Sequence, residues 1–261
     1  MANKTVTCLI VIPTLLNILN MSPKCTEETI RSLNTVFCGG DPIPRSSIEA
    51  FRKKFKLNID ILEAYAMTET LVVSAMPRNC KNFEGCGRLL SNVEAKIICT
   101  ETGETLGPNQ TGEIYIKTPS VMKGYFNNRE ATYKAFQNGW LRTGDIGYFD
   151  ENEFLFVTDR LKNMIKVHGC QVSPSEIENE LQKHPLVEEC CVIGKPDLKH
   201  GNLPLAFVIA KEKVSEEELQ NFMKDKLSEF KQLTGGIKFV ESLPKSGDGK
   251  ILKRELKLQI E

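Results

Sequence analysis

The chain has 261 residues, of which 41% are hydrophobic and 26% are charged, a composition typical of a globular protein. Basic and acidic residues balance at 34 each, so charge does not favour nucleic acid or an anionic membrane as partner. No apolar run reaches the roughly 18 residues of a membrane-spanning helix. The nine cysteines include no Cys-x-x-Cys pair, which disfavours a metal-ligand cluster or a disulfide framework. We therefore expect reduced thiols in the cytoplasm, and the terminal Gln259-Ile260-Glu261 is no Ser-Lys-Leu peroxisomal signal.

The first 65 residues alternate strand and helix signals. Residues 6–12 form a near-continuous apolar run, which predicts a strand covered on both faces. Residues 35–38 and 58–64 predict two further strands, and residues 44–55 predict a helix with an apolar stripe. This order favours a parallel α/β sheet. If the sheet is interrupted, residues 6–12 become an exposed apolar edge.

From residue 93 the pattern changes to short strands separated by turns. Residues 93–99, 112–117 and 154–158 predict strands, with one helix at residues 129–136. This segment is expected to form a small, mostly antiparallel β unit.

A compact α/β segment follows Arg160. Residues 173–176 and 215–218 each begin with a serine and end with a glutamate, which predicts a capped helix start at both places. Strands are predicted at residues 187–193, 204–210 and 236–240.

Two motifs in the first part carry residues suited to chemistry. Gly39 and Gly40 allow a backbone to approach a flat ring because glycine has no Cβ; an ordinary strand-to-helix turn is the alternative. The stretch 65–69 ends on a threonine and a glutamate, and a carboxylate suits Mg²⁺ when phosphates supply its other ligands. Alternatively, Thr68 caps a helix and Glu69 is its first-turn carboxylate.

Three further motifs lie nearer the C-terminus. Residues 143–145 predict a tight turn whose Asp145 is placed to accept hydrogen bonds from a diol, although a lone Thr-Gly-Asp is usually a surface turn. Residues 159–162 form a charged joint between apolar strands. Residues 243–251 form a lysine- and glycine-containing loop, for which a solvated basic turn is the alternative.

In this order the motifs resemble those of the adenylate-forming (AMP-binding) superfamily, in the branch of acyl- and aryl-CoA ligases, 4-coumarate-CoA-ligase-like enzymes and insect luciferases. The resemblance implies that Gly39 and Gly40 lie beside adenine and the acyl group, and that Tyr65 stacks on adenine. It also implies that Asp145 binds both ribose hydroxyls and that Arg160 reaches the ribose and phosphate side.

The resemblance assigns the reacting groups as well. It places Thr68 on the α-phosphate and Glu69 on Mg²⁺. Lys250 would bridge the substrate carboxylate and the α-phosphate in the first half-reaction, whereas Lys166 would serve the second. Lys162 takes the position of the hinge pivot.

Other stretches match the family less directly. Residues 112–116 and 121–127 resemble a structural signature, to which we assign a scaffold role and no chemistry. Ala66 stands where the family usually has glycine.

The expected fold class is α/β, with part of a large N-terminal domain followed by a small mobile α/β C-terminal domain. The first spans residues 1–159 and combines part of a parallel α/β sheet with a small β unit; residues 160–163 form the hinge, and residues 164–261 form the second domain. The resemblance covers only the C-terminal half of such an enzyme, because no glycine-, serine- and threonine-rich phosphate-binding loop occurs in this sequence.

The implied activity is an ATP-dependent acid–CoA ligase that joins a small carboxylic acid to AMP and then to CoA. ATP, Mg²⁺ and CoA are the implied cofactors and co-substrates. Two alternatives remain open: a truncated noncatalytic remnant, and a luciferin-type monooxygenase that differs in its second step. For the chain alone we expect no ATP–pyrophosphate exchange, since the loop that holds the β- and γ-phosphates is missing from it.

Overall fold

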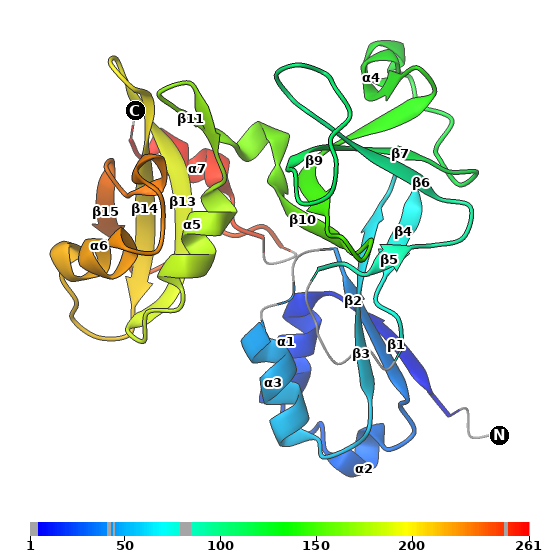
Figure 1. Ribbon diagram of the computed structural model, residues 1–261. Helices are drawn as coiled ribbons and strands as arrows, with labels where there is room; N and C mark the ends of the chain where they lie inside the picture. Colours follow the sequence, from blue (N-terminus) through cyan, green and yellow to red (C-terminus); the bar gives the residue numbers. More distant parts are fainter. Residues whose placement is uncertain (1–4, 41–42, 44, 79–84, 248–249, 261) are drawn as a thin grey trace. The chain divides into compact units, whose positions relative to one another are not determined.

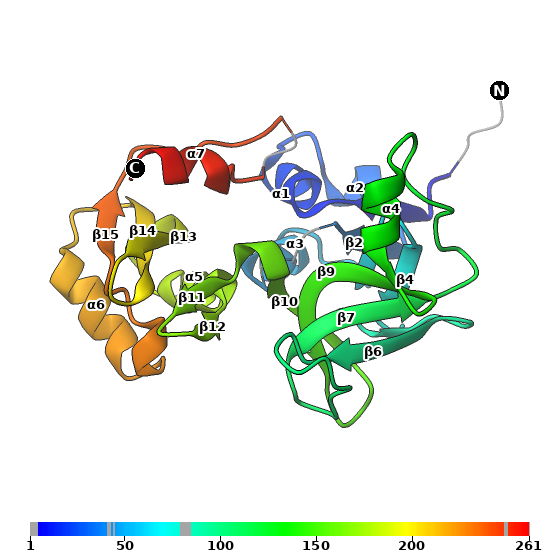
Figure 2. The same cartoon turned by 90° about the horizontal axis from the view of Figure 1, so that it is seen from above.

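The computed structural model describes residues 5–40, 43, 45–78, 85–247 and 250–260, and it is shown in two views in Figures 1 and 2. The chain divides into two compact units, Met1–Val157 (unit 1) and Thr158–Glu261 (unit 2). None of the described helices combines the length and the apolar character that crossing a membrane requires.

The first sheet of unit 1 has the strand order β1-β2-β3-β4-β5. Its strands are β1 (Cys8–Val11), β2 (Thr35–Gly39), β3 (Asp60–Met67), β4 (Leu71–Ala75) and β5 (Arg88–Leu89). The first three strands are parallel, which confirms the prediction from the alternating pattern. β4 runs antiparallel to β3, and β5 runs antiparallel to β4.

Helices connect the parallel strands, and they are α1 (Pro13–Met21), α2 (Glu27–Ile30) and α3 (Arg45–Lys54). Of these, α1 and α3 cover one face of the sheet (Figure 1). Leu16 of α1 and Phe51 of α3 are buried in one core with Ile61 of β3.

β1 is the edge strand of this sheet, with β2 as its neighbour. Ile10 is 80% exposed and Val6 is 55% exposed beside it. The predicted apolar edge at residues 6–12 is therefore confirmed. The prediction that this strand is covered on both faces is wrong, because helices pack on one face and Ile10 on the other is exposed.

The second sheet of unit 1 is the predicted antiparallel β unit. Its order is β10-β9-β7-β6, and β8 pairs with β9. The strands are β6 (Glu94–Ile98), β7 (Gly112–Lys117), β8 (Phe136–Gln137), β9 (Trp140–Phe149) and β10 (Leu155–Arg160), and α4 (Arg129–Ala135) is the helix predicted at residues 129–136.

Residues 143–145 lie inside β9, so the predicted tight turn is wrong. Tyr115 of β7 pairs with Arg142 and Glu113 pairs with Ile146, so three residues of β9 face one residue of β7. This is a β-bulge, and Gly144 accommodates it with a φ of +69°. A bulge explains the glycine as well as a turn does, because both need the left-handed region.

Unit 2 is built on a single sheet of order β12-β11-β14-β13, with β15 parallel to β14. Its strands are β11 (Ile165–Val167), β12 (Cys170–Val172), β13 (Val187–Asp197), β14 (Gly201–Ala210) and β15 (Gly236–Phe239). Its helices are α5 (Pro174–Leu181), α6 (Glu216–Lys224) and α7 (Lys253–Leu258), with single 3₁₀ turns η1 (Leu161–Asn163) and η2 (Glu229–Lys231).

The two predicted helix caps of unit 2 are confirmed. The side chain of Ser173 accepts a hydrogen bond from the Glu176 amide, and that of Ser215 accepts one from the Glu218 amide. In Figure 2, α5 and α6 lie on one face of the sheet and α7 on the other. Each face has its own buried core, represented by Val192 under α5 and by Phe207 under α7.

Candidate functional site

The glycine pair lies at the carboxyl end of β2. Gly39 pairs with Ala64 of β3, and a Cβ on Gly39 would lie 2.6 Å from the Ala64 carbonyl oxygen. Gly40 has a φ of +92°, which strongly favours glycine. Close packing of two strands therefore requires glycine at the first position, and backbone conformation favours it at the second. Gly39 therefore lies beside the residue that precedes Tyr65 in β3.

Tyr65 and Asp145 meet in the interior of unit 1. The Tyr65 hydroxyl donates a hydrogen bond of 2.6 Å to Oδ2 of Asp145, and the two residues are only 8% and 6% exposed. Burial raises the pKa of Tyr65, and the negative charge of Asp145 raises it further. The phenol therefore stays protonated and acts as a donor. Two residues that the sequence assigned to separate parts of a nucleotide are in direct contact.

The bulge in β9 holds Asp145 in place. The Asp145 amide donates to Oγ1 of Thr143 over 3.0 Å, and the same hydroxyl donates to the Ile114 carbonyl of β7 over 2.7 Å. Thr143 thus links the bulge to the neighbouring strand. The Asp145 carboxylate is set by a rigid sheet rather than by a surface loop.

Thr68 and Glu69 lie in the short connection between β3 and β4. The Thr70 amide donates to the Met67 carbonyl over 3.2 Å, and β4 starts at Leu71 with a φ of +62°. No helix begins here, so the alternative in which Thr68 caps a helix is wrong. Thr68 is exposed and Glu69 is half-buried, just beyond the strand that carries Tyr65.

Tyr125 contacts this connection and was missed by sequence reasoning, which treated residues 121–127 as scaffold. Its hydroxyl donates a hydrogen bond of 2.9 Å to Oε1 of Glu69. A tyrosine next to a glycine in a loop carries no periodic signal, so the contact could not be found from local pattern.

A second missed group is Glu63, a mostly buried carboxylate on β3. Its Cα pairs with Cys38 of β2, and its side chain accepts a hydrogen bond from the Ile43 amide. Burial raises the pKa of Glu63 from 4.5 to about 7. The available signal was an acidic residue inside an apolar strand, two positions before Tyr65.

The predicted hinge residues lie at the start of unit 2. Arg160 ends β10, and Lys162 is an exposed residue of the 3₁₀ turn that follows. The Asp159 carboxylate is buried, accepting hydrogen bonds from the Ser173 hydroxyl at 2.8 Å and from the Ser175 amide at 3.0 Å. It also accepts the Arg160 amide at 2.7 Å. The start of unit 2 is therefore fastened to the N-terminus of α5.

The two predicted catalytic lysines lie on separate segments of unit 2. Lys166 is exposed in the hairpin of β11 and β12, opposite Gln171. Lys250 lies between β15 and α7, where its amide donates to the Ser246 hydroxyl over 3.2 Å and its carbonyl accepts from the Ser246 amide over 2.8 Å. Leu243 and Ile251 pack in the core beneath α7, so both ends of this loop are anchored.

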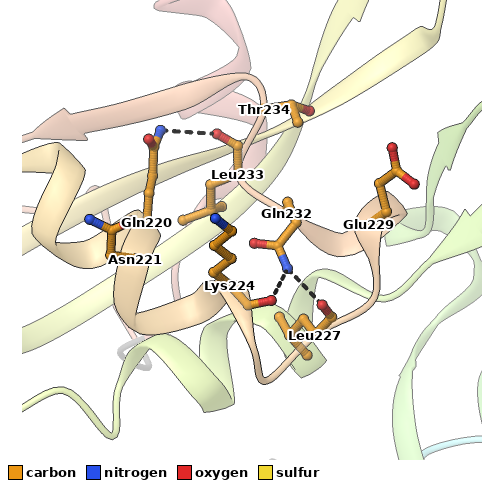
Figure 3. A pocket seen from close by; sticks show the side chains of 8 residues that line it. All are labelled: Gln220, Asn221, Lys224, Leu227, Glu229, Gln232, Leu233 and Thr234. Carbon is orange, nitrogen blue, oxygen red and sulfur yellow. Dashed lines mark hydrogen bonds between the residues drawn. The ribbon is translucent and has the colours of Figure 1, made fainter.

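Unit 2 also contains a pocket of about 480 Å³ between α6, η2 and the approach to β15 (Figure 3). The Gln232 amide group spans part of it by donating to the Lys224 and Leu227 carbonyls. None of the sequence-predicted site residues lines this pocket, so it is separate from the candidate site.

Unit 1 thus brings the Gly39–Gly40 pair, Tyr65 and Asp145 together and places Thr68 and Glu69 one short turn away. Unit 2 carries the predicted cations on three exposed segments: the end of β10 with η1, strand β11, and the loop before α7. The residues of unit 1 combine a stretch of glycine backbone, an aromatic ring and carboxylates. Such a set fits a nucleoside with a hydroxylated sugar and a metal-bound phosphate.

Two family models match the chain. One, described as AMP-binding enzyme, matches residues 1–126, and one described as AMP-binding enzyme C-terminal domain matches residues 176–250. Together they account for most of the chain; the first match lies within unit 1 and the second within unit 2.

Curated proteins and solved structures agree with these matches. The chain is 41% identical to 4-coumarate–CoA ligase-like 2 of Arabidopsis thaliana, over 88% of this chain and 42% of the relative. It is 37% identical to luciferin 4-monooxygenase of Nipponoluciola cruciata, over 96% of this chain and 46% of the relative. ATP-bound MatB from Rhodopseudomonas palustris is similar in structure, with a TM-score of 0.88 and 30% identity over 97% of this chain and 51% of that protein.

The chain therefore spans about half the length of the proteins that it matches. The motifs, the fold and both family models agree along this half: the chain belongs to the family of AMP-binding, adenylate-forming enzymes.

Proposed function

We propose that the chain provides the adenylate-binding half of an ATP-dependent acid–CoA ligase acting on a small carboxylic acid. The observation that carries the proposal is the buried pairing of Tyr65 with Asp145 beside the Gly39–Gly40 strand end. This contact fixes an aromatic ring and a carboxylate together, as recognition of adenine and of its ribose requires. The 41% identity to a 4-coumarate–CoA ligase-like protein supports a ligase.

The residues of unit 1 would bind and orient the nucleotide. Asp145 would accept hydrogen bonds from the ribose hydroxyls, while Tyr65 presents its ring to adenine. Thr68 would donate to the α-phosphate, and Glu69 would hold Mg²⁺ through its carboxylate. Bound ATP supplies the AMP group that activates the carboxylic acid, and pyrophosphate leaves.

The cations of unit 2 would act in turn. Arg160 would reach the ribose and phosphate side, and Lys250 would offset the charge that develops on the α-phosphate during attack by the carboxylate. Lys166 would serve thioester formation with CoA. Because the two lysines lie on different segments, a rotation about the hinge at Lys162 would exchange one for the other.

AMP binding by the 261-residue chain tests this proposal. We expect calorimetric titration to detect AMP binding that Asp145→Asn weakens at least about tenfold, since it removes an acceptor of charge-assisted hydrogen bonds. Glu151→Gln, an exposed carboxylate of the same unit, is the matched control and should leave the affinity unchanged. Equal AMP affinity in all three proteins, or no AMP binding by any of them, would contradict the proposal.

The second half-reaction separates the ligase from a luciferin-type monooxygenase. In the enzyme that carries this chain, a ligase forms a CoA thioester, whereas a monooxygenase consumes O₂ from the same acyl-AMP. The 37% identity to luciferin 4-monooxygenase makes both products worth measuring in one assay. A noncatalytic remnant would give neither product.

A further inference from the structure

The connection that carries Glu69 is held by a second segment of unit 1. Besides the Tyr125 hydroxyl on Oε1, the Met122 amide donates to the Glu69 carbonyl over 2.7 Å. The Ser120 hydroxyl donates to the Thr70 carbonyl over 2.7 Å. The loop at residues 118–125 therefore fixes both the backbone and the side chain of Glu69, from about 50 positions away in the sequence.

Tyr125 is itself fastened to α4. Its amide donates to Oγ1 of Thr132 over 2.9 Å, and that hydroxyl donates to the Asn128 carbonyl over 2.9 Å. Gly124 has a φ of +148°, and a Cβ there would lie 2.7 Å from Cγ2 of Thr132. The backbone at Gly124 and Tyr125 thus packs directly against α4. These contacts fix the position of the Tyr125 backbone, from which its ring extends.

The exposure of Tyr125 argues against a packing role. Its residue surface is 41% exposed, whereas Tyr65 and Tyr115 of the same unit are 8% and 5% exposed. A large aromatic at this exposure contributes little to the core, and its hydroxyl is the group that makes the specific contact. Glu69, in contrast, is a flexible side chain that loses rotamer freedom when it is held.

We propose that Tyr125 is a positioning residue for Glu69, whose carboxylate it holds through Oε1 so that Oε2 is directed to a divalent metal bound to nucleotide phosphate. The assignment of the metal to Glu69 rests on the proposed function. The role of Tyr125 deepens that function by giving control of the metal ligand to a residue of the stretch 121–127, to which the sequence analysis assigned no chemistry.

The first test needs no ligand. Three-bond couplings of Glu69, measured by NMR on the 261-residue chain at fixed pH, report whether its side chain occupies one rotamer. We expect one rotamer in the unmodified chain and in Tyr133→Phe, which loses the hydroxyl of a tyrosine that is 84% exposed on α4. Tyr125→Phe should give averaged couplings. Averaging already present in the unmodified chain, or absent from Tyr125→Phe, overturns the proposal.

The second test separates metal binding from nucleotide binding. We compare ATP affinity with and without Mg²⁺, and AMP affinity without metal, in the same proteins. Tyr125→Phe should reduce the gain in ATP affinity due to Mg²⁺ by about three- to tenfold, the value of one hydrogen bond. AMP affinity should stay within about twofold, because no metal is involved. A parallel loss of AMP affinity would show a merely structural role.

A double variant completes the design. In the Glu69→Gln background, Tyr125→Phe should add little further loss of the Mg²⁺ effect, because residues that act through one contact are not additive. Full additivity contradicts the proposal. If no protein binds nucleotide, the proposed function fails, while the rotamer measurement still decides whether Tyr125 positions Glu69.

Discussion

The Tyr65 hydroxyl donates a 2.6 Å hydrogen bond to the carboxylate of Asp145, joining β3 to the bulge of β9 across 80 positions of sequence. Removing the hydroxyl leaves a buried carboxylate with one donor fewer, which costs more than the loss of an exposed contact. We expect Tyr65→Phe to destabilise unit 1 by about 2 kcal/mol. Urea unfolding followed by Trp140 fluorescence measures it, since Trp140 is the single tryptophan of the chain. Tyr133→Phe is the control, and equal midpoints would show that the contact contributes no stability.

Glu63 makes the stability of unit 1 depend on pH. Because burial raises its pKa from 4.5 to about 7, the folded chain binds this proton more tightly than the unfolded chain. The stabilisation of the folded chain by protonated Glu63 is complete below about pH 4.5, and it is lost as the pH rises through about 7. Cys38 and Cys86, whose pKa values are raised to about 12 by burial and then by Glu63, stay neutral in this window.

The matched variant is Glu63→Gln, which retains an acceptor for the Ile43 amide and does not titrate. Relative to it, the unmodified chain should lose up to about 3 kcal/mol of unfolding free energy between about pH 4.5 and 8. Urea unfolding at several pH values, followed by Trp140 fluorescence, gives the difference. A difference that is independent of pH would mean that Glu63 titrates at its ordinary value.

Lys253 joins the two faces of unit 2 around the edge strand β13. Its ammonium donates to Oε1 of Glu178 over 2.9 Å, and the same oxygen accepts the Val192 amide over 2.7 Å. Lys253→Met leaves this carboxylate without its cation, so we expect unit 2 to lose about 2 kcal/mol of stability. Hydrogen exchange of the β13 amides measures it, with Lys257→Met on the same helix as the exposed control. If protection of β13 is unchanged, the ion pair contributes no net stability.

For a complete ligase of the kind proposed above, the two lysines of unit 2 should affect different half-reactions. We expect Lys250→Ala to lower ATP–pyrophosphate exchange by about 10²-fold, because a preplaced cation no longer offsets phosphate charge. Lys166→Ala should leave exchange nearly unchanged and slow CoA thioester formation from the acyl-AMP. Loss of the same half-reaction in both variants would refute the assignment.

Much of the fold follows from local pattern. The alternation of strand and helix signals in the first 65 residues is sufficient to predict a parallel sheet, because that order is typical of α/β proteins. The apolar run at residues 6–12 predicts the strand, although not its exposed face. The helix caps at Ser173 and Ser215 are also predictable, because a capping box is decided by four consecutive residues.

The contacts of the site were harder to predict because they join distant strands. Nothing local to Tyr65 indicates Asp145, and nothing local to Tyr125 indicates Glu69. The first pair joins strands of two different sheets, and the second joins two loops. The turn at residues 143–145 was wrong because a glycine in the left-handed region serves a bulge and a turn equally well. Glu63 was overlooked because its strand is otherwise apolar.

The Asp159 carboxylate has a consequence for any rotation between the two units. A pivot at Lys162 lies between Asp159 and its partners Ser173 and Ser175, so turning there has to break both hydrogen bonds. A pivot before Asp159 breaks neither. In the first case the rotation has an energy barrier, because the hydrogen bonds from Ser173 and Ser175 to Asp159 have to break before the units can turn. Asp159 then sets the rate of the rotation. In the second case the residues from Asp159 onward turn together with α5, and the pivot lies within strand β10, to which Asp159 belongs.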